Sequence, residues 1–556
     1  MYGIPTVTIV KTTLGSDSDT VTLTVDTSML SFTAKHLIVR INAISDATGD
    51  GQTVKMRFNG DSGNNYNQTQ YKAVGSTETR AQFDSRADIP LYDITNTANA
   101  FSGGEYLIPD AFTANTHKGG EGHFGKANEA VYAVAGRWAN TAAITSVTLL
   151  LTTGKFAATS DFELCVVDEG FAFGSQQVKT DDSSGYFSVG SITAAEGNLI
   201  CIGNLRDDRS LEVDIVKMHF GTGGGSVDTT TGNYERQRLL GSYANSMLAS
   251  NNNSDTFSYI AANTAPTDAF SPFIALIPNY EDGTMYRTFL AFGGVHATST
   301  MAYVQTEVMT WRNTGAITSF SLEGYVGSNF LEHSSLSTYI IPSVVDENNL
   351  IARLEVTGTS TQELSIPSIP DTYDHLEFTG FIRLSRGSTS HFNDIFVNGE
   401  VEGDNLSSYQ FIDGSGTSVG GNSYDPATGL VRSNSNSTAP EQFSPFSMTV
   451  FNYKKTDRHK HFMITGGFID EDGSDDAVYQ GSKRAEITAA VNRVDIDPNA
   501  AFYYMAGSVY ELRGVSATIP VGGPADIKKI NGIAAASIKK VNTIAKASLG
   551  KVNSIT

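Results

Sequence analysis

Short stretches of alternating apolar and polar residues recur along the chain, and turn-forming residues separate them. Residues 21–26 read Val, Thr, Leu, Thr, Val, Asp, the pattern of a half-buried β-strand. Similar runs occupy 37–41, 54–58 and 147–152, with Gly- and Asp-rich segments between them. Helical periodicity is absent before residue 518. The pattern predicts an all-β fold of the sandwich or jelly-roll type.

One nine-residue pattern, W-x-N-T-x-A-I-T-S, occurs at 138–146 and again at 311–319, and contains the only two tryptophans of the chain. A chance repeat of seven positions in nine is improbable, so the stretch marks a repeated fold. We expect the Trp to fill a core, the Asn and Thr to form a turn, and the Ile to start the next strand. The predicted fold landmarks are Trp138, Asn140, Ile144, Trp311, Asn313 and Ile317. The alternative is an exposed Trp beside an Asn, stacking on a sugar ring.

Further repeated landmarks divide the chain into three modules. They are V-K-M-x-F at 54–58 and 216–220, V-V-D-E at 166–169 and 344–347, H-L at 36–37 and 375–376, and F-S-P-F at 270–273 and 443–446. In the third copy, matching Thr488 to Thr141 and Val491 to Ile144 places Ala485 where Trp138 stands. We therefore predict three tandem β-sandwich or jelly-roll modules of about 170 residues, at 1–169, 170–347 and 348–517. Short linkers imply that the modules touch, as a stiff rod or as a compact cluster.

Residues 518–556 form a different kind of sequence, a basic and apolar repeat with a period of 11 residues. The segment carries six lysines against a single acid, Asp526. An 11-residue apolar repeat fits a helix that supercoils with partners, whereas Asn531-Gly532 fits a tight turn between short strands; both alternatives stay open. Because the stripe is too short to bury itself and its Ile and Val residues recur at fixed spacing, we expect it to dock on a partner rather than to be a disordered basic tail. The docking residues are Ile527, Lys528, Lys529, Ile530, Ile533, Ile538, Lys539, Lys540, Val541, Ile544, Leu549, Val552 and Ile555.

Composition and charge narrow the function classes. The net charge of -21 opposes nucleic-acid binding by the body of the protein, because phosphates must be neutralised by cations. No apolar run is long enough to span a membrane, and the N-terminal residues lack the pattern of a secretory signal. The two cysteines, Cys165 and Cys201, are too few for a disulfide scaffold or a zinc site, and both are expected to be buried thiols.

No catalytic motif is found, so we predict neither an enzyme nor a cofactor or metal site. The pair His459 and His461 is interpreted as part of a solvated basic turn rather than a metal site. The loop 59–65 is interpreted as a polar hairpin loop rather than a calcium site. The acidic run 470–472 suits a surface loop better than a glycosidase site, which needs two carboxylates across a cleft.

The repeated residues resemble a module of tailed-bacteriophage virion proteins. The resemblance rests on His36-Leu37, the F-N-G-D loop at 58–61 that ends in Asn65-Tyr66, the stretch 138–146, and Phe156 with Ser160. The I-K-K-[IV]-N-x-I-A-x-A-S units of the tail resemble the ends of phage tail and appendage proteins. The resemblance implies a non-enzymatic β-sandwich component of the virus particle, made in the host cytoplasm and located in the virion.

Several functions remain open on this basis. The first is a tail or neck appendage or fibre protein anchored by residues 518–556, and the second is a capsid decoration (head fibre) protein. A glycan-binding receptor protein is the third, motivated by the Trp–Asn pairs, and a depolymerase is disfavoured. The expected partners are other virion structural proteins, further copies of the chain (a trimer is one option) and a host-surface glycan, but neither nucleic acid nor membrane.

Overall fold

The computed structural model describes residues 6–515 with short gaps, together with 529–530 and 533–534. The gaps are 26–35, 50, 127–128, 168–172, 183–184, 194–195, 224–225, 243–246, 299, 344–348, 359–360, 362, 388–389, 400–405, 416–417, 425–430, 436–437, 471–475 and 499–501. Within the described residues there is no α-helix, and η2 (Thr231–Asn233) and η3 (Tyr325–Gly327) are single 3-10 turns. The all-β prediction is therefore confirmed for the part of the chain that the structure describes.

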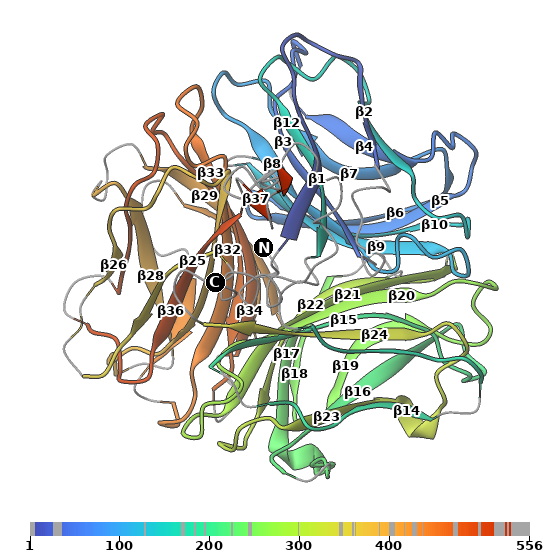
Figure 1. Cartoon of the computed structure of the whole chain (residues 1–556), viewed down its shortest axis with the longest axis vertical. Helices are drawn as coiled ribbons and strands as arrows, with labels where there is room; N and C mark the ends of the chain where they lie inside the picture. Colours follow the sequence, from blue (N-terminus) through green and yellow to red (C-terminus); the bar gives the residue numbers. More distant parts are fainter. Residues whose placement is uncertain are drawn as a thin grey trace.

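The strands form three sheet pairs, each made of one eight-stranded and one four-stranded sheet with antiparallel pairing. The strand order is the same in all three, and the three sheet pairs lie around a common centre (Figure 1).

The first sheet pair has the large sheet β1 (Thr6–Thr13), β12 (Asp161–Val167), β3 (Leu37–Ala43), β8 (Ser102–Ile108), β9 (Lys118–Lys126), β10 (Ala130–Trp138), β5 (Tyr66–Val74), β6 (Thr77–Arg86), and the small sheet β2 (Thr20–Thr24), β11 (Ser146–Leu151), β4 (Gln52–Phe58), β7 (Ile89–Ile94).

The second sheet pair has the large sheet β13 (Phe173–Val178), β24 (Ser335–Pro342), β15 (Gly197–Leu205), β20 (Ser271–Ile277), β21 (Arg287–Thr298), β22 (Met301–Trp311), β17 (Tyr234–Ser242), β18 (Met247–Asn252), and the small sheet β14 (Tyr186–Val189), β23 (Ser319–Gly324), β16 (Val213–Gly221), β19 (Thr256–Ala261).

The third sheet pair has the large sheet β25 (Leu350–Glu355), β36 (Val509–Val515), β27 (His375–Ile382), β32 (Ser444–Phe451), β33 (Lys460–Phe468), β34 (Ala477–Ala485), β29 (Leu406–Ser415), β30 (Ser418–Tyr424), and the small sheet β26 (Leu364–Ile366), β35 (Val494–Asp497), β28 (Ser390–Val397), β31 (Val431–Asn434).

Burial differs between the two kinds of sheet. In β2 and β11 of the first small sheet, buried residues alternate with more exposed ones, as expected for a sheet with one face on a core. In β3, β8, β9 and β10 of the first large sheet, every residue is buried. The central strands of the large sheet are thus covered on both faces.

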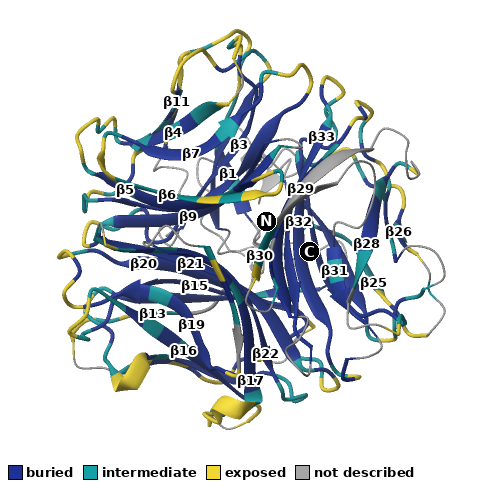
Figure 2. Cartoon of the chain, turned by 180° about the vertical axis from the view of Figure 1, so that it is seen from behind, coloured by how far each residue is buried: buried dark blue, intermediate teal, exposed yellow. Residues whose placement is uncertain are grey.

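The hydrophobic clusters explain this double burial. One cluster lies between the two sheets of each pair. A further cluster joins the three large sheets, with Ala133 from the first, Val308 from the second and Val478 from the third. The three large sheets therefore face one another at the centre, with the small sheets outside (Figures 1 and 2). The arrangement is a closed cluster, so the rod alternative is wrong.

Three equivalent glycines set how closely the large sheets approach. Gly125, Gly294 and Gly467 each lie seven residues after the start of β9, β21 and β33. A Cβ atom would lie 2.2 Å from Ser482 Oγ at Gly125, 2.2 Å from Ala135 Cβ at Gly294, and 2.8 Å from Val308 Cβ at Gly467. Ser482, Ala135 and Val308 belong to β34, β10 and β22 of the neighbouring sheet pair, so one contact recurs around the cluster.

Replacing Gly294 by alanine is expected to lower the free energy of unfolding by about 1–3 kcal/mol, because the added methyl group overpacks the contact with Ala135. Gly283→Ala is the matched control, since nothing lies within 4 Å of a Cβ there, and it should change stability by less than about 0.5 kcal/mol. Denaturant unfolding of both variants measures the difference. Equal stabilities of the two variants would show that the large sheets do not depend on this contact.

Only a small part of the C-terminal tail is described. β37 (Lys529–Ile530) and β38 (Ile533–Ala534) pair antiparallel, which agrees with the strand alternative for those four residues. The remaining predicted docking residues lie outside the described residues.

Candidate functional site: the junctions between the sheet pairs

Equivalent main-chain hydrogen bonds connect the three sheet pairs in a ring. In each of these hydrogen bonds, the backbone N–H of the residue just before β9, β21 or β33 donates to a backbone carbonyl of the next sheet pair. The bonds run from His117 to Asp268 (2.9 Å), from Tyr286 to Glu441 (2.9 Å) and from His459 to Asn99 (3.0 Å). Because the third returns to the first sheet pair, the ring is closed within one chain.

A buried cation follows each of these donors and holds the repeated stretch in place. Lys118 Nζ donates to Thr141 O (3.1 Å), Arg287 Nη2 to Thr314 O (3.0 Å), and Lys460 Nζ to Thr488 O (3.3 Å). Burial lowers the pKa of Lys118 and of Lys460 to about 8. The three acceptors are the threonines that the sequence aligned, so the alignment of the third copy has a structural counterpart.

The two tryptophans lie in the cores, and each is 1% exposed. Trp138 Nε1 donates to Asp61 Oδ2 (2.7 Å), and Trp311 Nε1 donates to Asp228 Oδ2 (3.0 Å). Partial burial raises the pKa of Asp61, but hydrogen bonds from the indole and from Asn65 outweigh it and hold that pKa below its usual range. Stacking on a sugar needs an exposed ring, and neither indole provides one.

The other fold landmarks build the turn after each Trp. Asn140 Oδ1 accepts from Ala142 N (2.9 Å), and Asn313 Oδ1 accepts from Gly315 N (2.8 Å). A backbone hydrogen bond then fixes the buried aliphatic residue: Ile144 N to Ala111 O, Ile317 N to Tyr280 O, and Val491 N to Tyr453 O, each 2.9 Å. The strand β11 begins at Ser146, two residues later than predicted.

The loop 59–65 uses its polar groups internally. Asp61 Oδ1 accepts from Gly63 N (2.8 Å), and its Oδ2 accepts from Asn65 and from Trp138. Asn59 Nδ2 donates to Ala143 O (2.8 Å), as Asn398 Nδ2 does to Ala490 O (2.9 Å) in the third sheet pair. The segment is thus a polar loop, but the predicted hairpin is wrong, because the loop joins β4 of the small sheet to β5 of the large sheet and these two strands do not pair.

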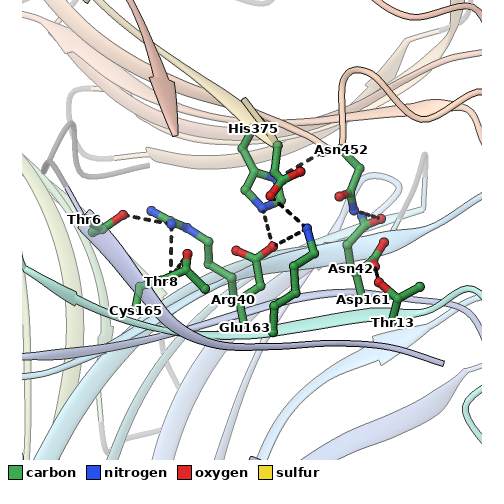
Figure 3. A network of polar contacts seen from close by, with 12 residues as sticks. Thr6, Thr8, Thr13, Arg40, Asn42, Asp161, Glu163, Cys165, His375 and Asn452 are labelled. Atoms are coloured by element: carbon green, nitrogen blue, oxygen red, sulfur yellow. Dashed lines mark hydrogen bonds and ion pairs between the residues drawn. The ribbon is translucent and has the colours of Figure 1, made fainter. Parts of the chain in front are cut away.

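The junction between the first and third sheet pairs carries a buried network of charges (Figure 3). Glu163 Oε1 lies 3.0 Å from His375 Nε2 and 3.0 Å from Lys11 Nζ. Burial by itself raises the pKa of Glu163, but His375, Lys11 and Arg40 outweigh it and hold that pKa well below its usual range. Arg40, 2% exposed, in turn pairs with Glu105 (2.6 Å) and reaches Glu377 across the junction (3.4 Å).

Arg458 makes a further ionic contact across this junction. Its Nη1 lies 2.6 Å from Asp161 Oδ2, its Nη2 donates to Thr159 O (2.8 Å), and its guanidinium lies 4.2 Å from the centre of the Phe101 ring. The side chains of Arg458 and Asp161 are 1% and 2% exposed. Breaking such a buried pair by removing one partner is costly, since the remaining charge is left without compensation.

These contacts correct two sequence interpretations. The solvated basic turn at 458–461 is wrong, because Arg458, Lys460 and His461 are buried; His461 Nε2 lies 3.0 Å from Ser482 Oγ. Asp470, predicted in a surface loop, is 1% exposed and its N–H donates to Asp476 (2.7 Å). The partners of Arg458, Asp161 and Thr159, come from a distant segment, and a local charge pattern cannot indicate them.

The other two junctions use the same positions with different side chains. The residue that precedes the first leucine of β3, β15 and β27 accepts the N–H of a left-handed residue: His36 from Asp110, Asn198 from Asn279, and His375 from Asn452. Each then contacts the next sheet pair. His36 packs edge-on against Tyr339 at 6.2 Å, and Asn198 Nδ2 donates to Glu511 Oε2 (3.1 Å). Strong ionic pairing is concentrated at the junction of the first and third sheet pairs.

A polar cluster lies where all three large sheets meet. Tyr71 OH lies 2.8 Å from both Thr306 Oγ1 and Gln480 Oε1, and Gln480 Nε2 lies 3.0 Å from the His123 ring. All four side chains are 0% exposed. Burial lowers the pKa of His123 to about 3, so the neutral ring accepts from Gln480. Thr306 of β22 and Gln480 of β34 stand at the strand position that Ala133 holds in β10. Because the three side chains differ, the cluster is not threefold symmetric and allows one arrangement of the sheets.

Sequence reasoning missed one carboxyl pair, Asp207 and Asp214. Ser328 Oγ lies 2.8 Å from Asp207 Oδ2 and 3.2 Å from Asp214 Oδ2. Burial and the neighbouring Asp214 raise the pKa of Asp207 to about 8. Both carboxyls are at most 2% exposed, and a hydrolytic acid pair must face a substrate. This pair therefore has a structural role.

The remaining chemistry-bearing residues are also part of the interior. Cys165 and Cys201 are free and buried, as expected, and Arg40 Nη1 donates to Cys165 Sγ (3.2 Å). Among the described residues, no group of three His, Cys, Asp or Glu side chains could hold a metal ion. No helix in the described part of the chain is long and apolar enough to cross a membrane.

Comparisons with known proteins find little. No protein-family model and no curated protein matches the chain. Among solved structures, a protein of unknown function from the DUF3598 family of Nostoc punctiforme PCC 73102 is 8% identical, with 54% of this chain and 95% of that chain covered and a TM-score of 0.11. OccK9 (OpdG) of Pseudomonas aeruginosa is 10% identical, with 86% and 96% covered and a TM-score of 0.11. TM-scores of this size support no inference about fold or function.

Proposed function

We propose that this chain is a non-enzymatic structural component of a phage particle, built from three tandem β-sandwich modules. In this role it is a tail or neck appendage or fibre protein that residues 518–556 anchor to another virion protein. The observation that carries the proposal is the closed ring of three sheet pairs, held by equivalent main-chain hydrogen bonds across its junctions. Such a ring is a rigid block, because none of its sheet pairs can move without breaking two junctions.

The resemblance of the repeated stretches to phage virion modules supports the same role. The buried charged groups of the junctions hold sheet pairs together, and the body of the chain is acidic while the tail is basic. A basic tail suits attachment to an acidic partner surface.

The compact ring favours one second candidate, a capsid decoration protein. The three sheet pairs, alike in strand order, are arranged about a common centre (Figure 1). That geometry matches a site where three copies of a shell protein meet. The ring also places three units in one chain, so a single copy supplies an arrangement that a homotrimer would otherwise build.

Removal of residues 518–556 tests the proposal. The truncated chain is expected to fold with unchanged thermal stability but to be missing from purified particles, because its docking segment is gone. A control variant with Lys528, Lys529, Lys539 and Lys540 replaced by Gln keeps the apolar stripe, and shows whether charge or apolar contact anchors the chain. Imaging of particles with the intact chain separates the two roles: a few copies at the tail vertex support an appendage, and many copies over the shell support decoration. Normal incorporation of the truncated chain, or absence of the intact chain from particles, contradicts the proposal.

A further inference from the structure

A cleft of about 400 Å³ opens in the first sheet pair, away from the junctions. It lies between β5 and β6 at the edge of the large sheet and β4 and β7 at the edge of the small sheet. Its volume falls within the range of small-ligand sites, roughly 300–1,000 Å³. The residues that define its chemistry are Thr53, Lys55, Gln70, Lys72, Phe83, Arg86, Asp93 and Tyr132.

Positive charge dominates this cleft, although the chain as a whole is acidic. Lys55, Lys72 and Arg86 line it against one carboxylate, Asp93. Lys72 Nζ lies 3.8 Å from Asp93 Oδ2, and Lys55 Nζ lies 3.9 Å from Asp88 Oδ2. Both separations exceed hydrogen-bond distance, so the ammonium groups keep their donors for another acceptor.

Neighbouring hydroxyl groups already satisfy Asp93. Thr53 Oγ1 donates to its Oδ1 (2.7 Å), and Tyr132 OH donates to its Oδ2 (3.0 Å). These bonds hold the carboxylate and the Tyr132 ring at the base of the cleft. The cations above are therefore available to an anion that enters from solvent.

Aromatic surface accompanies the cations. Lys72 Nζ lies 5.7 Å from the centre of the Tyr132 ring, and the Arg86 guanidinium lies 5.6 Å from the centre of the Phe83 ring. Aromatic faces pack against the apolar face of a sugar ring, and side-chain amides and hydroxyls such as Gln70 bind its hydroxyl groups. Cations combined with aromatic and amide groups suit an acidic sugar better than a simple inorganic anion.

The cleft chemistry is absent from the equivalent positions of the other sheet pairs. Lys72 is paired with Tyr132 across β5 and β10. The equivalent pairs are Leu240 with Gln305 and Asp413 with Tyr479. The same fold is thus built without Lys72, so its presence beside Tyr132 is not needed for folding.

We propose that this cleft binds an acidic saccharide, with its carboxylate held by Lys55 and Lys72 and its ring against the partly exposed Phe83. The site is separate from the indole rings that first suggested glycan binding, and it goes beyond the structural role. A particle protein with such a cleft contacts carboxylated sugars on a surface while its ring supplies rigidity.

Binding is tested with the intact chain on an array of carboxylated, sulfated and neutral saccharides, with an acidic peptide alongside, followed by calorimetry on the strongest carboxylated saccharide. Lys72→Gln is expected to weaken that binding about tenfold or more, since it removes a charge-assisted hydrogen bond. Arg86→Gln should act in the same direction, and higher salt should weaken binding by the intact chain. Lys217→Gln is the matched control: Lys217 occupies the position of Lys55 in the second sheet pair and is paired with Asp255 at 3.3 Å.

Selective binding of carboxylated saccharides that Lys72→Gln weakens and Lys217→Gln leaves unchanged supports the site. Binding only to sulfated or neutral saccharides, binding only to the acidic peptide, equal binding by Lys72→Gln and the intact chain, or no binding at all overturns it. A melting temperature of Lys72→Gln equal to that of the intact chain shows that any loss arises at the cleft. If the chain binds no carboxylated saccharide, its incorporation into particles is not affected. The two experiments therefore distinguish failure of the saccharide site from failure of the proposed function.

Discussion

Replacing Arg458 by alanine is expected to lower the free energy of unfolding by about 3–5 kcal/mol. The change removes the only cation within hydrogen-bond distance of the Asp161 Oδ2 atom among the described residues, and leaves a carboxylate that is 2% exposed without compensation. It also removes the cation packed on Phe101 and the donor to Thr159 O. Denaturant unfolding measures the loss.

Hydrogen exchange of individual backbone amides shows which part of the fold is destabilised in Arg458→Ala. The His459 amide bonds to Asn99 across the junction of the first and third sheet pairs, so it should exchange faster in Arg458→Ala. The Tyr286 amide, at the equivalent place between the second and third sheet pairs, should change less. Arg493→Ala is the control variant: Arg493 also pairs with two carboxylates, but its side chain is 41% exposed, and little change is expected. Equal effects of the two arginine variants would contradict a special role for the junction.

Trp138→Ala is expected to lower the free energy of unfolding by about 3–5 kcal/mol through the cavity that it leaves. The indole packs on Phe58 at 5.6 Å and on Tyr66 at 6.3 Å between ring centres. Asp61 also loses its indole donor. Unfolding can be followed by the fluorescence of Trp311, which becomes the only tryptophan.

Trp138→Phe serves as the control, because it keeps most of the volume and removes mainly the hydrogen bond to Asp61. A smaller loss than that of Trp138→Ala assigns the difference to the cavity. If Trp138→Ala changes stability by less than about 1 kcal/mol, the core repacks around the gap. The third sheet pair holds Ala485 at this register, fully buried, so a core built around alanine is attainable when its neighbours have been selected with it.

The ring geometry gives the two proposals a common physical basis. Three sheet pairs in one chain need no assembly step between copies, and the asymmetric cluster of Tyr71, Thr306 and Gln480 fixes the order of the sheets. One sheet pair can then carry a binding site of its own while the other two keep only their structural role. The cleft with Lys72 and Tyr132 is an example of such a difference.

The sequence by itself determined the all-β class, because alternation of apolar and polar residues is a local property of strands. It also located strands such as β2, β4 and β11 to within two residues. The repeat of Trp138, Asn140 and Ile144 at 311–317 aligned the first two copies, since each residue serves the same turn and core in both. A local sequence pattern predicts the role of a residue wherever the contacts of that residue lie within its own sheet pair.

Only the tertiary structure decided how the large sheets face one another and which charges are buried. Arg458 meets Asp161 at a separation of 297 positions, and His375 meets Glu163 at 212. Burial at these junctions depends on partners that are distant in the sequence. A short basic run is therefore interpreted as a solvated turn, and only the tertiary structure shows the carboxylates that lie beside it. Gly294 shows the same limit: its lack of a side chain has a meaning only when Ala135 of another sheet lies against it.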